Sequence, residues 1–598
     1  MKKIIYTVVC GLSLGLSSCQ GTFLDLEPLD QSTDVVYFKT PTHFKEYSTG
    51  FYGQLLGWQS RYGNIYEHMD ISTDLSTWFD YSRDVARGEI KVVNDDGRWD
   101  NCYSNIRTVN ILLERAQSYP GNLEDIQQYL SEAYFFRAYS YFYLLKFFGG
   151  VPIVTSVLDT ESSGLTAPRN SRYEVVDFIL SDLDKAIAHL PMEQNISDAD
   201  KGRVSKWAAK AFKARVLLYE ATWRRYNGTS TDYEGSAGPV SNQINAFLDE
   251  AIALSDEVMS KGGYELWDKR SDSNIGTDSS HYLFRLGDPY TEGLGYGRSS
   301  NKEFILYGVY DSSLRPGAIY LGQTLPKMKP SRKLMDMFLC TDGYPAHVSD
   351  NFQGYHKTGD EFKNRDYRMN AYLGTPGTTT SLSDGQAGYS GGRKFGSNFE
   401  GKKESANYPI IRLAEVYLIY AEAWCERNGD IKDAQLNKSI NKVRARAGVA
   451  PLTEALLVEA NKRAAAQAGG ETEEQAYSML GEIRRERAIE LYMEGHRFDD
   501  LKRWGIAEIE LNVARCGMVV GDAGYSTSFK DATGTVTSLY LPNKYVYGEE
   551  AVSTADGVLK CVVIDSKDNY HFAKTHYLWP LPQKQINMNP SLKQNPGY

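Results

Sequence analysis

The strongest hydrophobic pattern in the chain lies in residues 132–154, EAYFFRAYSYFYLLKFFGGVPIV. Small and aromatic side chains recur there at steps of three and four, which places them on one helical face: Ala133, Phe136, Ser140, Tyr143 and Phe147. The other side carries further rings: Phe135, Tyr139 and Phe142. A helix that is apolar nearly all round is a buried helix. We therefore predict a central buried helix that ends at Gly149 and Gly150, with Pro152 preventing its continuation.

Other segments with helical periodicity are separated by turns and form pairs. The pairs are residues 103–118 with the central helix, residues 171–190 with 204–226, and residues 410–427 with 431–447. A short helix is expected between Thr40 and Trp58. Helical pairs that bury their apolar faces against their neighbours are typical of tetratricopeptide-type units, although the spacing here follows no strict period. The pattern predicts a mostly α fold built as a superhelix of helical pairs.

The interval 261–408 breaks the helical pattern. It is rich in Gly, Ser, Asn and Asp, and it contains turn signals and short strand-like pieces such as residues 303–309. A loop-rich insertion of this length is usually functional or disordered, and its aromatic content argues against disorder. Trp267, Tyr290 and Tyr296 lie here. We expect the insertion to carry short β-strands and to provide one candidate ligand face.

A second candidate face is the irregular segment 59–100. Aromatic residues on a polar loop are not all explained by a core, and the segment holds Trp78, Tyr81 and Trp99 among many Asp, Asn and Gly residues. Rings can stack on the apolar face of a ligand, while Asp74 and Arg83 can bind its polar edge. Trp99 is ambiguous, because it either contacts ligand or packs the start of the next helix.

The N-terminus has the organisation of a bacterial lipoprotein signal. Lys2 and Lys3 precede an apolar run, and Leu16-Ser17-Ser18-Cys19 fits a lipobox. We expect residues 1–18 to be removed and Cys19 to be acylated, so that residues 19–598 are anchored to a membrane by lipid. The alternative is an ordinary signal peptide in which the cysteine falls by chance.

Composition and missing motifs restrict the function. The 598 residues carry a formal net charge of -10, and no basic stripe is visible, which argues against a nucleic-acid partner. The chain contains 42 tyrosines, a residue that suits both packed helices and surfaces for hydroxyl-rich ligands. No phosphate-binding loop, nucleophile elbow or zinc motif occurs, and the nine histidines are scattered. We expect no enzyme activity, no cofactor and no metal.

Two groups of reactive or charged residues leave alternatives open. Residues 483–505 are dense in Arg and Glu, and Arg487, Glu490 and Glu494 fall at helical spacings. A paired structural network is favoured over an active site there, because no nucleophile or metal ligand accompanies the charges. Among the cysteines, Cys425 is expected to be a buried thiol, and a bridge between Cys516 and Cys561 has no support from the pattern.

Four stretches carry a family resemblance. They are the opening residues 21–30, the central helix with its FGGVP end, residues 483–505, and the ending with LWPLP and QNPGY. The chain thereby resembles the SusD/RagB family of surface glycan-binding lipoproteins of Bacteroidetes. The resemblance implies four tetratricopeptide-type units in a right-handed superhelix over residues 19–598. It also implies an outer-membrane location facing the exterior, capture of an oligosaccharide, and delivery to a SusC-like TonB-dependent transporter.

On this reading the ligand-binding candidates are Trp78, Tyr81, Arg83, Asp74, Trp267, Tyr290 and Tyr296. The alternatives are a tetratricopeptide-type protein-interaction scaffold and, with less support, a surface glycosidase. A glycosidase needs only two suitably spaced carboxylates, and a sequence does not reveal their separation. The sequence also leaves the identity of the glycan open.

Overall fold

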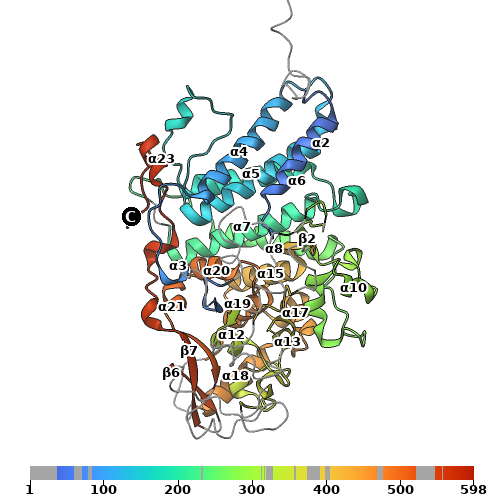
Figure 1. Cartoon of the computed structure of the whole chain (residues 1–598), viewed down its shortest axis with the longest axis vertical. Helices are drawn as coiled ribbons and strands as arrows, with labels where there is room; N and C mark the ends of the chain where they lie inside the picture. The colour runs from blue at the N-terminus through green and yellow to red at the C-terminus, as the bar shows by residue number, and fades with distance from the viewer. Residues whose placement is uncertain are drawn as a thin grey trace, which may run out of the picture.

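A computed structural model gives the fold of the chain (Figure 1). It describes residues 37–58, 70–78, 84–229, 233–311, 313–315, 317, 328–355, 359–373, 391–396, 405–467, 476–519, 546–554 and 557–598. The signal sequence and Cys19 lie outside these residues. In the described part of the chain, every helix is too short or too polar to cross a membrane.

The N-terminal half is a stack of antiparallel helices. Its helices are α2 (Pro41–Thr49), α3 (Asp84–Arg87), α4 (Gly97–Ala116), α5 (Gln127–Phe148), α6 (Arg172–His189), α7 (Lys206–Asn227) and α8 (Ile244–Lys261). Consecutive helices from α4 to α8 pack against each other, as Figure 1 shows. α5 is the predicted central helix, and it buries side chains on every side. It ends at Gly149, whose positive φ of 75° is one that glycine adopts readily.

The C-terminal half continues the stack across the insertion. Its helices are α15 (Leu413–Asn428), α16 (Asp433–Lys438), α17 (Ile440–Arg446), α18 (Glu454–Gln467), α19 (Met479–Glu490), α20 (Arg497–Arg503), α21 (Ala507–Leu511) and α23 (Gln583–Met588). α15 packs between α8 and α19. The predicted fold of helical pairs is confirmed, but the helix expected over 431–447 is broken at Ser439, whose φ and ψ of -127° and -100° are not helical.

The insertion is loop-rich and holds short elements, as expected. They are α9 (Ser279–Tyr282), α10 (Pro289–Gly293), β2 (Phe304–Gly308), β3 (Met328–Pro330), α12 (Arg332–Met337) and α13 (Tyr367–Leu373). β3 pairs antiparallel with β1 (Ser76–Trp78), and β2 pairs antiparallel with β4 (Tyr408–Arg412). Since β4 runs directly into α15, the β2–β4 pair fastens the insertion to the helical stack at the C-terminal end of the insertion.

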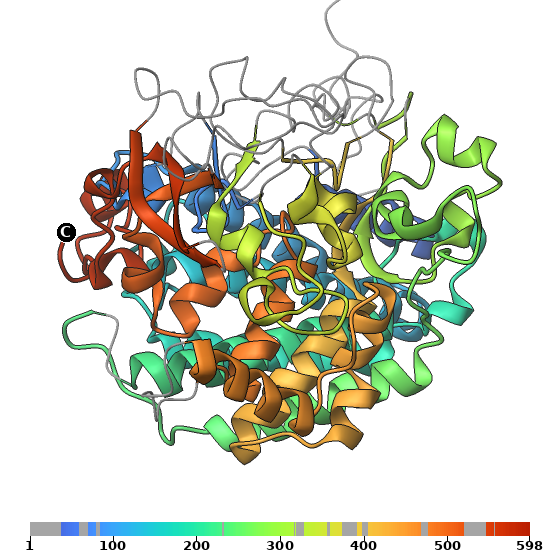
Figure 2. The ribbon, with the colours of Figure 1, turned by 90° about the horizontal axis from the view of Figure 1, so that it is seen from below.

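A separate three-stranded sheet has the order β5-β7-β6, with β5 at Arg515–Val519, β6 at Val546–Thr554 and β7 at Gly557–Asp565. This sheet and the α10 region lie on opposite sides of the molecule (Figure 2). The register places Cys516 opposite Val563 and Cys561 opposite Val519, so the two cysteines do not face each other. Cys425 is a buried thiol, as predicted.

The Arg- and Glu-rich stretch forms a buried ion-pair network. Glu490 accepts from Arg368 at 2.7 Å and also contacts Arg412 and Arg446, and all of these side chains are at most 1% exposed. Glu494 accepts a hydrogen bond from Arg412 Nη2 at 2.7 Å. The structural reading of this stretch is therefore confirmed. The expected helical spacing fails at Glu494, because α19 ends at Glu490.

Candidate functional site

The structure corrects the expected role of Asp74. This carboxylate is 1% exposed, accepts from the Arg497 guanidinium at 2.9 and 2.7 Å, and lies 2.8 Å from the Lys333 ammonium. Burial alone would raise the pKa of Asp74, but the two cations hold it well below its ordinary value. A buried, fully paired carboxylate does not bind the edge of an external ligand. The partner Arg497 is remote in sequence, so no local pattern indicated the pair.

The remaining candidates of the first segment stay predictions. Trp78 is the last residue of β1, where its backbone pairs with Met328. Its side chain, together with Tyr81 and Arg83, lies outside the described residues. The ambiguous Trp99 is resolved: it is 5% exposed, and its ring centroid lies 4.9 Å from that of Tyr103 and 5.3 Å from that of Phe148. Trp99 therefore packs the start of α4 against the end of α5.

The insertion holds two ring pairs, Tyr282 with Tyr290 and Trp267 with Tyr296, which are linked at α10 by the hydrogen bond from the Tyr296 backbone N–H to the Thr291 carbonyl. We call these four ring residues the insertion ring cluster. Tyr290, in the first turn of α10, is half exposed at 50%. Its ring is stacked on that of Tyr282, with centroids 6.1 Å apart and planes 15° from parallel. Asp288 caps α10 by accepting from the Tyr290 backbone N–H at 2.8 Å. The cap and the stack together fix the orientation of an exposed aromatic face.

A buried cation supports this stack from within. The Arg285 guanidinium carbon lies 5.9 Å from the Tyr282 ring centroid and 5.6 Å from the Tyr290 ring centroid. Its charge is balanced by Asp288, which accepts at 3.1 and 2.6 Å. Burial and the hydrogen bond to Tyr290 raise the pKa of Tyr282, so the Tyr282 phenol stays protonated at neutral pH. Tyr282 and Arg285 were not identified from the sequence.

Trp267 and Tyr296 form the second half of the insertion ring cluster. Their rings meet edge to face with centroids 5.7 Å apart. Tyr296 donates its hydroxyl to Asp272 at 2.9 Å, and this hydrogen bond, more than burial, raises its pKa. Trp267 is only 3% exposed and donates its indole N–H to Ser300 at 3.2 Å. The expectation of an exposed Trp267 is therefore wrong, because this indole is part of the packing beneath Tyr296.

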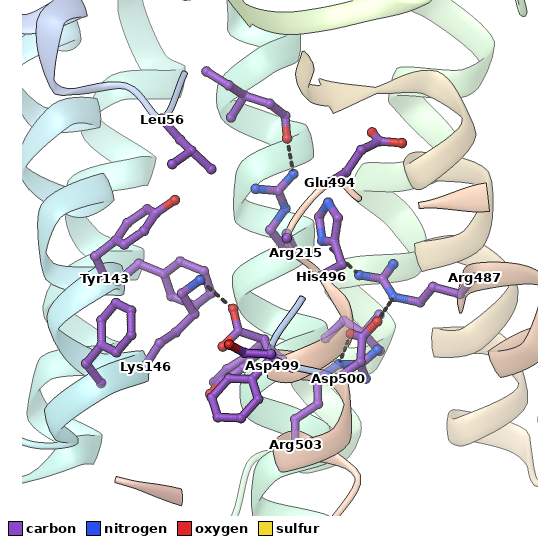
Figure 3. Close-up of a pocket in the computed structure, with 18 of the residues that line it drawn as sticks. Leu56, Tyr143, Lys146, Arg215, Arg487, Glu494, His496, Asp499, Asp500 and Arg503 are labelled. Carbon is purple, nitrogen blue, oxygen red and sulfur yellow. Dashed lines mark hydrogen bonds and ion pairs between the residues drawn. The ribbon is translucent and has the colours of Figure 1, made fainter. Parts of the chain in front are cut away.

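An internal cavity of about 90 Å³ lies between α5, α7 and α20 (Figure 3). Lys146 donates to Asp499 at 2.5 Å, and Arg487 donates to Asp500 at 2.8 Å across its walls. Burial and the neighbouring arginines lower the pKa of His496 well below its ordinary value, so its imidazole is neutral. Ligand pockets usually measure about 300–1,000 Å³, so this cavity is too small for a sugar chain. Its walls are mixed, and the charged side chains among them suit ordered water instead.

Among the described residues, no group of three or more His, Cys, Asp or Glu side chains is placed to hold a metal ion. Among the described rings of the insertion, Tyr290 is the most exposed. The insertion ring cluster supplies stacking and hydrogen bonding. Of the charged residues beside it, Arg285 is paired with Asp288, whereas Lys269 and Glu292 have no ion-pair partner among the described residues.

Two family models match the chain. The model described as "SusD family" matches residues 393–598, and the model described as "Starch-binding associating with outer membrane" matches residues 22–218. A SusD-like protein of Bacteroides ovatus is 24% identical over 520 residues, which cover 83% of this chain and 82% of that protein.

Solved structures agree with the fold. A SusD-like carbohydrate-binding protein from Bacteroides fragilis has a TM-score of 0.65 at 23% identity, covering 93% of this chain and 99% of that one. A laminarin-binding SusD-like protein has a TM-score of 0.58 at 18% identity, covering 94% and 100%. The two family models cover the first helical units and the C-terminal part of the chain. The solved structures match the fold across both parts. The chain belongs to the SusD/RagB family.

Proposed function

We propose that this protein captures oligosaccharides at the bacterial surface and passes them to a TonB-dependent outer-membrane transporter without a catalytic step. The family description names starch binding and outer-membrane association, and one structural relative carries the name carbohydrate-binding protein. The observation that carries the proposal is the exposed, stacked ring of Tyr290 in the loop-rich insertion. Lipid attached to Cys19 would hold the chain at the membrane, facing the exterior.

The chemistry of the insertion ring cluster fits a sugar. A pyranose ring shows C–H groups on its faces and hydroxyls on its edge, so an exposed aromatic face can stack on it. Tyr290 is held by Tyr282 and by the α10 cap, and therefore little side-chain entropy is lost on binding. The neighbouring Asp272 and Tyr296 offer an acceptor and an aromatic edge. Trp78, Tyr81 and Arg83 are proposed to add contacts from the first segment.

We expect Tyr290→Ala to weaken oligosaccharide binding. Losing a stacked ring removes about 0.5–1.5 kcal/mol, which raises the dissociation constant about two- to twelvefold. Isothermal titration calorimetry with maltoheptaose and laminarihexaose measures this, because the relatives are described as binding starch and laminarin.

Tyr290→Phe is the matched control, because it keeps the ring and removes only the hydroxyl. Its affinity should stay within about twofold of the wild type. If a sugar binds the wild type and Tyr290→Ala with equal affinity, the binding site does not include Tyr290. The absence of heat with either sugar would leave the protein-interaction scaffold as the better reading.

A further inference from the structure

A second concave site lies at the boundary between the helical stack and the insertion. Its cavity volume is about 530 Å³, within the range of ligand pockets. Residues 193–201 before α7, the end of α8 at Gly262 and Gly263, and strand β2 form its walls. We call it the β2 cleft. Three rings line it, from Tyr264, Phe304 and Tyr307, so much of its surface is aromatic.

The β2 cleft has hydrogen-bonding groups that the fold does not use. The side-chain oxygen of Asn301 accepts from the backbone N–H groups of Glu303 and Phe304 at 2.9 and 3.1 Å. The side-chain oxygen of Asn407 accepts from the Tyr310 backbone N–H at 3.4 Å. These hydrogen bonds to the side-chain oxygens fix the orientation of both amide groups. Within the described part of the chain, neither amide nitrogen has a hydrogen-bond partner.

Tyr307 adds a third such group. No partner for its hydroxyl occurs among the described residues, although the residue is half-buried on β2. Burial and the nearby Glu193 raise the pKa of Tyr307 to about 12, so the hydroxyl keeps its proton and is able to donate. Groups that donate hydrogen bonds beside aromatic rings are the usual specificity elements of a ligand pocket.

The cations in the β2 cleft have partners: Lys201 pairs with Glu193, Lys302 pairs with Glu265, and Arg298 is bound to a backbone carbonyl, whereas the Asp198 carboxylate has no partner among the described residues. Lys201 donates to the Glu193 backbone carbonyl at 3.0 Å and lies 3.5 Å from its carboxylate. Arg298 donates to the Ser405 backbone carbonyl at 2.6 Å. An anionic ligand would need a cation without such a partner, whereas a neutral ligand with many hydroxyls needs rings and neutral donors. The lining therefore favours an uncharged, polyhydroxylated ligand.

We propose that the β2 cleft is a second carbohydrate-binding site, separate from the insertion ring cluster. The class of ligand rests on the proposed function, whereas the residues are independent of it. One short segment separates the two sites. Ser300 accepts the indole N–H of Trp267 beneath the insertion ring cluster, while its neighbours Ser299 and Asn301 line the β2 cleft. The buried Trp267 of the insertion ring cluster is therefore close to the β2 cleft.

Val309 is a built-in reporter, because it lines the β2 cleft and is 38% exposed. The full mature chain with ¹³C-labelled valine methyl groups would be titrated with maltoheptaose and laminarihexaose, and methyl shifts would be followed by NMR. We expect the Val309 methyl signals to move with at least one sugar. Val458 on α18, which is 62% exposed, should not respond. Sorbitol at matched hydroxyl concentration controls for non-specific shifts.

Two variants test the site without disturbing the core. Ser299→Trp fills the β2 cleft from an exposed position and should abolish the Val309 response. Tyr307→Phe keeps the ring and removes one hydrogen bond, which should raise the dissociation constant read from Val309 about fivefold. Tyr290→Ala should leave that constant within about twofold, because the two sites use different residues.

The outcomes separate this inference from the proposed function. In one outcome Tyr290→Ala lowers the affinity measured by calorimetry, while the Val309 methyl signals do not shift with sugar. That result would overturn the β2 cleft as a binding site and keep the insertion ring cluster as one. A Val309 response that Ser299→Trp abolishes would support the β2 cleft even if Tyr290→Ala had no effect. A response that survives Ser299→Trp, or that sorbitol reproduces, would overturn the β2 cleft.

Discussion

Replacing Glu490 by alanine is expected to lower the free energy of unfolding by about 3–5 kcal/mol, the cost of breaking a buried ion pair. Glu490 is completely buried and accepts from the guanidinium groups of Arg368, Arg412 and Arg446. Removing this carboxylate takes one hydrogen-bond acceptor from each of three buried guanidinium groups. Water does not replace the lost acceptor, because the region is buried. Urea denaturation followed by circular dichroism measures the loss. A decrease below about 1 kcal/mol would contradict a structural role for this network.

The matched control is Glu454→Ala, because Glu454 pairs with Lys432 at an exposed position. Exposed ion pairs contribute about 0–1 kcal/mol, so this variant should unfold nearly as the wild type does. The pH dependence gives a second readout. Burial opposes ionisation of Glu490, but the arginines hold its pKa well below the ordinary value. Its contribution is therefore full above the unfolded pKa and is lost as the pH falls toward the folded pKa, and Glu490→Ala should lack this component.

The helical framework was predictable because its signal is local. Rings and small residues at steps of three and four predict α5, and Gly149 ends this helix with a positive φ. α8 has a comparable pattern, with Phe247, Leu248 and Ala251 buried on one face, and yet it was not predicted. α8 packs on α7, which precedes it, and also on α15, which follows only after the whole insertion. The contact with α15 could not be predicted from neighbouring segments.

The candidate site was less predictable because burial there depends on distant partners. Asp74 looked like a polar loop residue, but Arg497 neutralises it from 423 positions away. Trp267 looked like an exposed ring, but Ser300 and Glu303 satisfy its indole and backbone N–H groups. Tyr290 matched expectation in being exposed, whereas its support from Tyr282 and Arg285 came only from the structure. Composition indicates how many rings a loop has, but tertiary contacts decide which of them face solvent.

The second glycine of the FGGVP segment leads to another large effect. Gly150 lacks a positive φ, so its requirement for glycine is one of space. A Cβ atom at this position would collide with the backbone oxygen of Asn170, and it would lie 2.7 Å from the Arg172 nitrogen. The obstacle is backbone at the start of α6, which does not yield as a flexible side chain does. The chain leaving α5 therefore passes against the start of α6 only if residue 150 has no side chain.

We expect Gly150→Ala to lower the free energy of unfolding by about 1–3 kcal/mol, because overpacking forces α5 and α6 apart. Gly53→Ala is the matched control, since a Cβ there meets nothing within 4 Å. Urea denaturation of both variants measures the difference. Arg169 donates to the carbonyls of Gly150 and Phe148 at 2.7 and 2.8 Å, so a shift of residue 150 should also disturb this anchor. Equal stability of the two variants would mean that the α5–α6 junction relaxes freely, and the FGGVP segment would then owe its second glycine to something other than close packing.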